Sequence, residues 1–89
     1  MTHVFCIECI KEIAKGLDGD AFRVLAELSA ERSGQSELMD KTGLSIYRLR
    51  AALNCLRGAR LITLDIDKLY ILSDNGERMQ ALAEQGVIR

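Results

Sequence analysis

Two cysteines near the start of the chain are the residues whose spacing most directly suggests chemistry. Cys6 and Cys9 form a Cys-Ile-Glu-Cys run, and the single histidine, His3, lies three residues before it. Two thiols at this spacing can share a zinc ion or close a reactive disulfide. A structural zinc site needs four ligands, so these three residues fall one short. Three interpretations are open: a metal site, a redox pair, or two small apolar residues on a helix.

The helix that must carry these cysteines favours the apolar interpretation. Residues 1–18 predict an amphipathic N-terminal helix, because apolar residues recur at helical spacing and Glu and Lys lie opposite. A free cysteine on such a stripe behaves as a small hydrophobe, and burial raises its thiol pKa. We therefore expect no cofactor. The stripe can be covered by a second copy in a homodimer, which is our expectation, or by packing on the domain's own core. The predicted dimer interface comprises Cys6, Cys9, Ile10, Ile13, Leu17, Met79 and Leu82.

Length and composition limit the chain to one small domain. The 89 residues are 48% hydrophobic and 28% charged, which supplies one modest core over residues 1–89. Three cysteines, an odd number, do not fit a secreted disulfide framework and predict a cytoplasmic protein. No run approaches the roughly 20 apolar residues of a membrane span. A single histidine and the lack of a glycine-rich phosphate loop argue against an enzyme.

The charge is distributed unevenly along the chain. Although the net charge is −1, the window 41–64 holds five basic residues and no acidic one. The rest of the chain holds seven basic and 13 acidic residues. One local element therefore carries a positive field, as a phosphate-binding surface requires.

Capping residues and periodicity predict the elements around this window. Asp20, Ser36, Ser45 and Ser73 are the expected helix N-caps, and Gly43 is an expected left-handed helix end. Two β-rich runs, 61–64 and 69–72, flank a polar turn and predict an antiparallel hairpin, with Ile62, Leu64, Tyr70 and Leu72 covering the helices. The predicted fold is mainly α with a small β-hairpin.

Three segments within this pattern carry a family resemblance. SELMDKTGLS, LSIYRLRAALNCLRGARLI and YILSDNGERM follow one another between Asp20 and about Leu82. Together they resemble the winged helix-turn-helix of prokaryotic transcriptional regulators of the MarR, PadR and ArsR type. The resemblance implies a helix-turn-helix and wing over 20–72, with flanking helices over 1–18 and 73–89 that form a dimer. It implies a sequence-specific regulator that binds double-stranded DNA as a homodimer through recognition helix 45–58.

Helical geometry indicates which side chains of that helix face outward. With Leu49, Leu53 and Leu56 on the buried side, Tyr47, Arg50, Ala51 and Asn54 fall on the exposed face at about 100° per residue. Arginine pairs with guanine and asparagine with adenine in the major groove. The predicted base-reading residues are Tyr47, Arg48, Arg50, Ala51 and Asn54, of which Tyr47 can contact either a thymine methyl or a phosphate. The predicted phosphate contacts are Ser36, Lys41, Ser45, Arg57 and Arg60.

The predicted wing differs from that of many such regulators. Its tip is Asp-Ile-Asp-Lys, so Lys68, the predicted DNA contact of the wing, is a single basic residue beside Asp65 and Asp67. We therefore expect the hairpin to serve mainly as structure. Two other functions are also consistent with the sequence: a winged-helix module that binds proteins without specific DNA binding, and a thiol- or metal-responsive regulator acting through Cys6 and Cys9.

Overall fold

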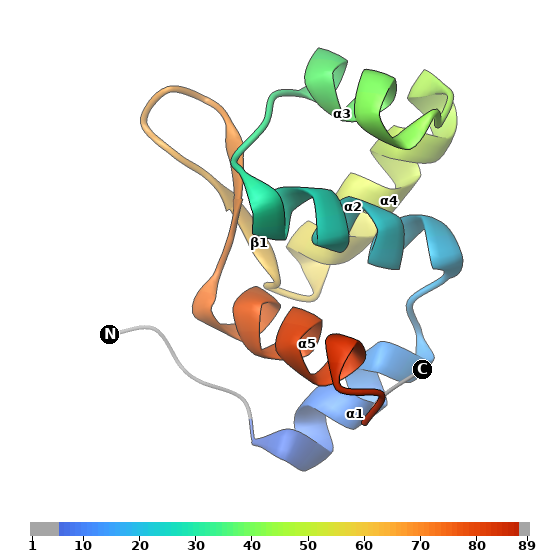
Figure 1. The fold of residues 1–89 in the computed structure, drawn as a ribbon, viewed down its shortest axis with the longest axis vertical. Helices are drawn as coiled ribbons and strands as arrows, with labels where there is room; N and C mark the ends of the chain where they lie inside the picture. Colours follow the sequence, from blue (N-terminus) through green and yellow to red (C-terminus); the bar gives the residue numbers. More distant parts are fainter. Residues whose placement is uncertain (1–5, 88–89) are drawn as a thin grey trace.

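The fold is mainly helical, as predicted. The structure, a computed structural model, describes residues 6–87. Along this part of the chain the elements are α1 (Ile7–Lys15), α2 (Gly19–Ala30), α3 (Gln35–Thr42), α4 (Ile46–Gly58), β1 (Ile62–Leu64), β2 (Tyr70–Leu72) and α5 (Asp74–Glu84) (Figure 1). Helix α1 lies at the opposite end of the molecule from α3 and the start of α4 (Figure 1).

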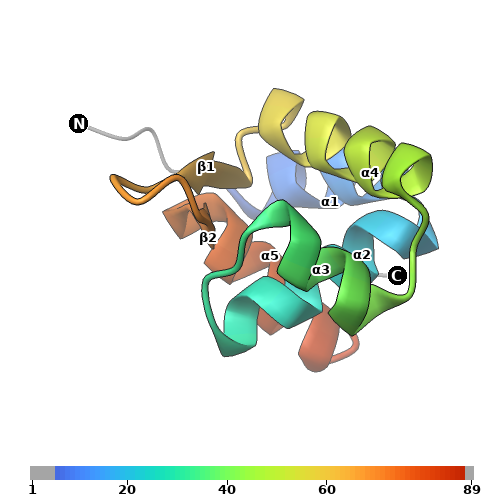
Figure 2. The same cartoon turned by 90° about the horizontal axis from the view of Figure 1, so that it is seen from above.

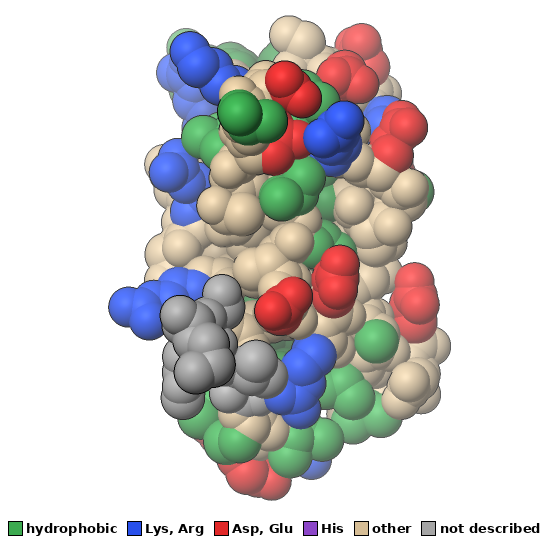
Figure 3. All heavy atoms as spheres, turned by 90° about the vertical axis from the view of Figure 1, so that its left-hand side faces the viewer, with side chains coloured by type: hydrophobic (Ala, Val, Ile, Leu, Met, Phe, Trp, Pro, Cys, Tyr) green, Lys and Arg blue, Asp and Glu red, His purple; other side chains and the backbone are tan. Residues whose placement is uncertain are grey.

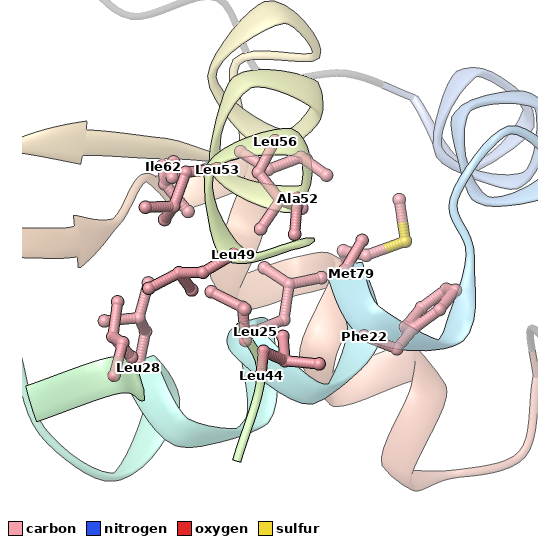
Figure 4. Packing of buried hydrophobic residues seen from close by; sticks show 14 of the residues in the cluster. Phe22, Leu25, Leu28, Leu44, Leu49, Ala52, Leu53, Leu56, Ile62 and Met79 are labelled. Atoms are coloured by element: carbon pink, nitrogen blue, oxygen red, sulfur yellow. The ribbon is translucent and has the colours of Figure 1, made fainter. Parts of the chain in front are cut away.

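The core lies between α2, α4 and α5. Leu25 of α2, Leu49 and Leu56 of α4 and Met79 of α5 are fully buried, and their side chains point toward one another (Figure 4). Helix α1 adds Ile10, which is also fully buried. Burying a side chain of this size contributes roughly 1.5–3 kcal/mol, so this cluster holds α4 firmly on the domain.

The helix-turn-helix geometry depends on a glycine and a serine that the sequence identified. Gly43 ends α3 with φ 73°, a left-handed conformation that glycine adopts without a Cβ penalty. Ser45 then begins α4, where its Oγ accepts a hydrogen bond from the backbone N–H of Arg48 at 3.3 Å. Leu38 and Leu44, on either side of this turn, are buried. The turn therefore sets the direction in which α4 leaves the domain.

Two predicted helix starts are wrong by two residues. Helix α2 begins at Gly19, because Asp18 and not Asp20 accepts the capping bond, from the N–H of Ala21 at 2.9 Å. Helix α3 begins at Gln35 after Gly34, so Ser36 lies inside the first turn and does not cap it. At the start of α3 the carboxylate of Glu37 accepts a hydrogen bond from the N–H of Gly34 at 3.2 Å, which fixes the helix start two residues before the predicted cap.

The wing is a short antiparallel hairpin that projects from the helices (Figure 2). Its register pairs Ile62 with Leu72 and Leu64 with Tyr70. Ser33, after α2, extends the pairing: its N–H donates to Tyr70 at 3.2 Å and its carbonyl accepts from Tyr70 at 2.8 Å. Three of the four predicted covering residues pack on the core; Leu64 is exposed, because the hairpin extends past the helices there.

The last helix approaches the strand region at a glycine. Ser73 caps α5 by accepting from the N–H of Gly76 at 3.1 Å, as predicted. A Cβ at Gly76 would overlap the carbonyl oxygen of Leu61, which itself accepts a 2.9 Å hydrogen bond from the N–H of Ser73. The position therefore requires glycine because the backbones lie so close.

Candidate nucleic-acid interface

Helix α4 presents one face to the core and the opposite face to solvent. It lies along one edge of the molecule (Figure 2). Leu49, Ala52, Leu53 and Leu56 form its buried side, whereas Tyr47 at its N-terminal end is 80% exposed. The exposed residues of α4 are Tyr47, Arg48, Arg50, Ala51, Asn54, Cys55, Arg57 and Gly58. All five predicted base-reading residues are therefore on the surface.

Three arginines of the window 41–64 are exposed and are not neutralised by an acidic partner among residues 6–87. Arg50, Arg57 and Arg60 are exposed, and within residues 6–87 none of them forms an ion pair. In a surface view, some Lys and Arg side chains lie along the left edge, apart from the acidic side chains, whereas others lie among acidic side chains near the centre (Figure 3). Positive charge without acidic neighbours, as along this edge, suits a polyanionic ligand.

Arg48 differs from these three, because its guanidinium is already engaged. Its Nε and Nη2 donate to the two carboxylate oxygens of Asp20 at 2.9 and 2.6 Å, which is a bidentate pair between α4 and α2. The hydrogen bond and charge of Asp20 raise the pKa of Arg48. Asp20 is free to make this contact because Asp18 caps α2 in its place. Arg48 therefore holds two helices together and carries no excess charge toward a ligand.

Lys41, a predicted phosphate contact, is engaged in the same way. Its Nζ donates to Glu31 at 2.7 Å and to the hydroxyl of Ser33 at 2.9 Å. The bond to Glu31 raises the pKa of Lys41, and Lys41 in turn lowers the pKa of Glu31. The ammonium therefore ties α3 to the segment that follows α2.

The remaining predicted phosphate contacts are exposed but differ in their freedom. Ser36 lies exposed on α3, and Ser45 is exposed although its Oγ is used as the N-cap of α4. Lys68 is exposed at the wing tip with φ 64°, the left-handed region that side chains other than glycine seldom adopt. No ion pair of Lys68 is found in the described part of the chain.

The acidic wing tip is organised by Asp65. Its Oδ1 accepts from the backbone N–H groups of Asp67 at 2.8 Å and Leu69 at 3.0 Å, and its Oδ2 accepts from Arg32 at 2.9 Å. The N–H of Leu69, chiefly, lowers the pKa of Asp65, and Arg32 acts in the same direction. The carboxylate therefore shapes the turn and ties it to the end of α2. Sequence reasoning identified the acidity of the tip but not its partner.

The expected burial of the two N-terminal thiols is wrong. Cys6 and Cys9 are both exposed. Cys6 is the N-cap of α1 and precedes its first turn, and Cys9 lies at the margin of the stripe, about 100° from the buried Ile10. The Sγ atoms are 3.3 Å apart, and the Sγ of Cys6 accepts from the N–H of Cys9 at 3.4 Å. In residues 6–87 no three His, Cys, Asp or Glu residues are grouped to hold a metal, and His3 lies outside this range.

The predicted dimer interface divides by burial. Ile10 and Met79 are fully buried by the chain itself, so their side chains have no surface left for a second copy. The two thiols are exposed, whereas three apolar residues, Ile13, Leu17 and Leu82, are half-buried against the core. Ile7, which the prediction omitted, is 40% exposed at the start of α1. Ile7 lies beside the predicted apolar stripe, so a prediction based on a wider stripe would have included it.

Comparison with solved structures connects this geometry to known proteins. A transcriptional repressor, CouR, bound to p-coumaroyl-CoA, matches 90% of the chain with a TM-score of 0.72 and 25% identity. The reduced form of MarR from E. coli matches 88% with a TM-score of 0.71 and 21% identity. The chain has the winged-helix fold of MarR-type regulators.

This match confirms the fold that the three sequence segments suggested. The chain spans only 61% of the CouR chain and 60% of the MarR chain, so the likeness covers part of each. No protein-family model and no curated protein matches the sequence. Among residues 6–87, no helix is long and apolar enough to cross a membrane.

Proposed function

We propose that this chain is a sequence-specific DNA-binding transcriptional regulator that acts in the cytoplasm as a homodimer and has no catalytic role. The observation that carries the proposal is the exposed face of α4, which bears Arg50 and Arg57 with no acidic residue on the helix. The winged-helix fold shared with a transcriptional repressor supports it. In such folds the N-terminal part of this helix enters the major groove.

The exposed residues divide between base and phosphate contacts by their place on α4. Tyr47, Arg50, Ala51 and Asn54 lie in its first three turns, so we assign them to base edges, with Arg50 pairing guanine and Asn54 pairing adenine. Arg57 and Arg60 lie at and beyond the helix end and are assigned to phosphates. Arg48, paired with Asp20, is assigned to positioning α4 and not to base reading.

The homodimer would form through α1 and the end of α5. These elements lie side by side at one end of the molecule (Figure 1). Ile7, the first residue of α1, and Val87, which follows α5, are exposed at 40% and 46%. A second copy that covers these residues would place two α4 helices on successive half-sites of one DNA face. Because an acidic wing would add little to DNA affinity, that affinity would depend on two recognition helices that bind together.

DNA binding is tested by anisotropy titration of the chain against fragments selected from a pool of genomic DNA. At two salt concentrations, Arg50→Ala should lower specific affinity by about 5- to 150-fold, the loss of one bidentate base contact. Lys15→Ala is the matched control, because it removes one positive charge from α1, where Lys15 pairs with Glu12. Equal affinity for the wild type, Arg50→Ala and Lys15→Ala would refute the proposed recognition surface.

A protein-binding module is the second candidate, and the internal ion pairs favour it. Glu31 and Asp20 neutralise Lys41 and Arg48, two of the five basic residues in the window 41–64. The same titration separates the two functions. A module of this kind would bind DNA only weakly, without sequence preference, and with an affinity that falls steeply with salt.

A further inference from the structure

The start of α1 places two exposed thiols in contact. Cys6 Sγ and Cys9 Sγ are 3.3 Å apart, and neither thiol is buried. Residues three apart across the first helical turn have Cα atoms about 5 Å apart, inside the range that a disulfide spans. Closing the bond requires the sulfurs to approach by somewhat more than an ångström, to about 2.05 Å. A side-chain rotation at the exposed helix end can supply this movement.

The two thiols are chemically unequal. The backbone N–H of Cys9 donates to Cys6 Sγ, and this hydrogen bond is the main reason why the pKa of Cys6 is lowered. Once Cys6 is a thiolate, only Cys9 has a proton to donate across the 3.3 Å gap, and this bond raises the pKa of Cys9. The helix N-terminus also favours negative charge at Cys6. An attacking thiolate and a neighbouring resolving thiol are thus present in one turn.

We propose that Cys6 and Cys9 form a reversible intramolecular disulfide by exchange with small-molecule disulfides. The Cys6 thiolate attacks one sulfur of the oxidant, forms a mixed disulfide and releases one thiolate. Cys9 loses its proton and attacks Cys6 Sγ, which expels the second thiolate and closes the protein disulfide. The two released thiolates take up the protons that Cys6 and Cys9 lost. Two protein thiols are oxidised by two electrons with loss of two protons, and one small disulfide is reduced to two thiols. This chemistry does not depend on the proposed DNA binding.

Mass spectrometry after equilibration with reduced and oxidised glutathione tests the proposal. The wild type should lose two hydrogens, with Cys6 and Cys9 in one disulfide-linked peptide, and dithiothreitol should restore both thiols. Cys9→Ser should abolish the disulfide and accumulate a glutathione adduct on Cys6. Cys6→Ser should also abolish the disulfide, and the adduct on Cys9 should form more slowly. Cys55→Ser is the control, because Cys55 is an exposed thiol on α4 and should leave the reaction unchanged.

Three outcomes would overturn the proposal. A disulfide that joins two chains would assign these thiols to contact between copies. Equal adduct formation at Cys6, Cys9 and Cys55 would show that exposure alone determines reactivity. Failure of the wild type to close a disulfide over the potentials of glutathione mixtures would exclude the exchange. Because the readout is the mass of the chain, a negative DNA titration would leave this result unaffected.

Discussion

Arg48 of α4 and Asp20 of α2 form a bidentate ion pair, with N–O distances of 2.9 and 2.6 Å, between residues 28 apart in the chain. The side chain of Arg48 is 63% exposed and that of Asp20 only 19% exposed, so the acidic partner lies beneath the arginine. A planar fork of this kind fixes orientation as well as charge. Helix α4 is therefore held to α2 by a residue that the sequence alone predicts to be a DNA contact.

Asp20→Asn should increase DNA affinity, because it removes the charge that neutralises Arg48 and leaves the side chain nearly the same size. The slope of log affinity against log salt should steepen by about 0.9 if Arg48 gains one phosphate. Anisotropy titrations over a salt series measure this slope. The control is Asp74→Asn, which removes one exposed negative charge from the first turn of α5.

The double variant Asp20→Asn with Arg48→Ala should return to the slope of the wild type. Arg48→Ala alone should weaken binding much less than Arg50→Ala. Equal losses for the two arginine variants would show that the pair with Asp20 opens on DNA and that Arg48 does read or neutralise the ligand.

Asp65 should make the stability of the domain depend on acid pH. Its folded pKa is lowered, chiefly by the N–H of Leu69, so its stabilisation is complete above the unfolded value of about 3.9 and is lost as pH falls through the folded value. The gap in unfolding free energy between the wild type and Asp65→Ala should therefore shrink below about pH 4. Urea denaturation followed by circular dichroism at neutral and acid pH measures both curves.

A matched pair of variants separates the two roles of this carboxylate. Asp65→Asn keeps an oxygen for the N–H groups of Asp67 and Leu69 but loses the ion pair with Arg32, so it should destabilise less than Asp65→Ala. Arg32→Ala should resemble Asp65→Asn. If all three variants are as stable as the wild type, the turn is held by its backbone alone.

The features that the sequence predicted depend on contacts within one helical turn. Those that it missed depend on contacts between residues far apart in the chain. Gly43, Ser45 and Ser73 act within one helical turn, and their roles followed from residue type and spacing. The partner of Arg48 lies 28 residues away, and the partner of Asp65 is 33 away, so no local pattern revealed them. Because Asp18 caps α2, Asp20 is left to pair with Arg48, and this pairing between distant residues is not visible in the local sequence. The burial of Ile10, likewise, depends on how α1 meets α5.

Gly76→Ala should destabilise the domain strongly, because the new Cβ would overlap the carbonyl oxygen of Leu61, a backbone atom that cannot rotate away. Overpacking of this kind costs about 1–3 kcal/mol, and in so small a domain it can prevent folding. Gly58→Ala is the control, since a Cβ there meets no atom within 4 Å, and it should stabilise α4 by about 0.4–1 kcal/mol. Thermal denaturation of both variants tests the contrast. A Gly76→Ala variant as stable as the wild type would mean that α5 can move away from Leu61 without loss.

Ile7→Asp should weaken the proposed homodimer without unfolding the chain. Ile7 is 40% exposed and is the first residue of α1, where a carboxylate interacts favourably with the helix N-terminus. The same charge placed in an interface of apolar residues would be buried without a partner and would oppose association. Sedimentation equilibrium should show a higher dissociation constant for Ile7→Asp than for the wild type. Ile66→Asp is the control, because Ile66 is 95% exposed at the wing tip, far from α1, and should leave association unchanged. If the wild type sediments as a monomer at high concentration, or if the two variants behave alike, α1 does not form the dimer.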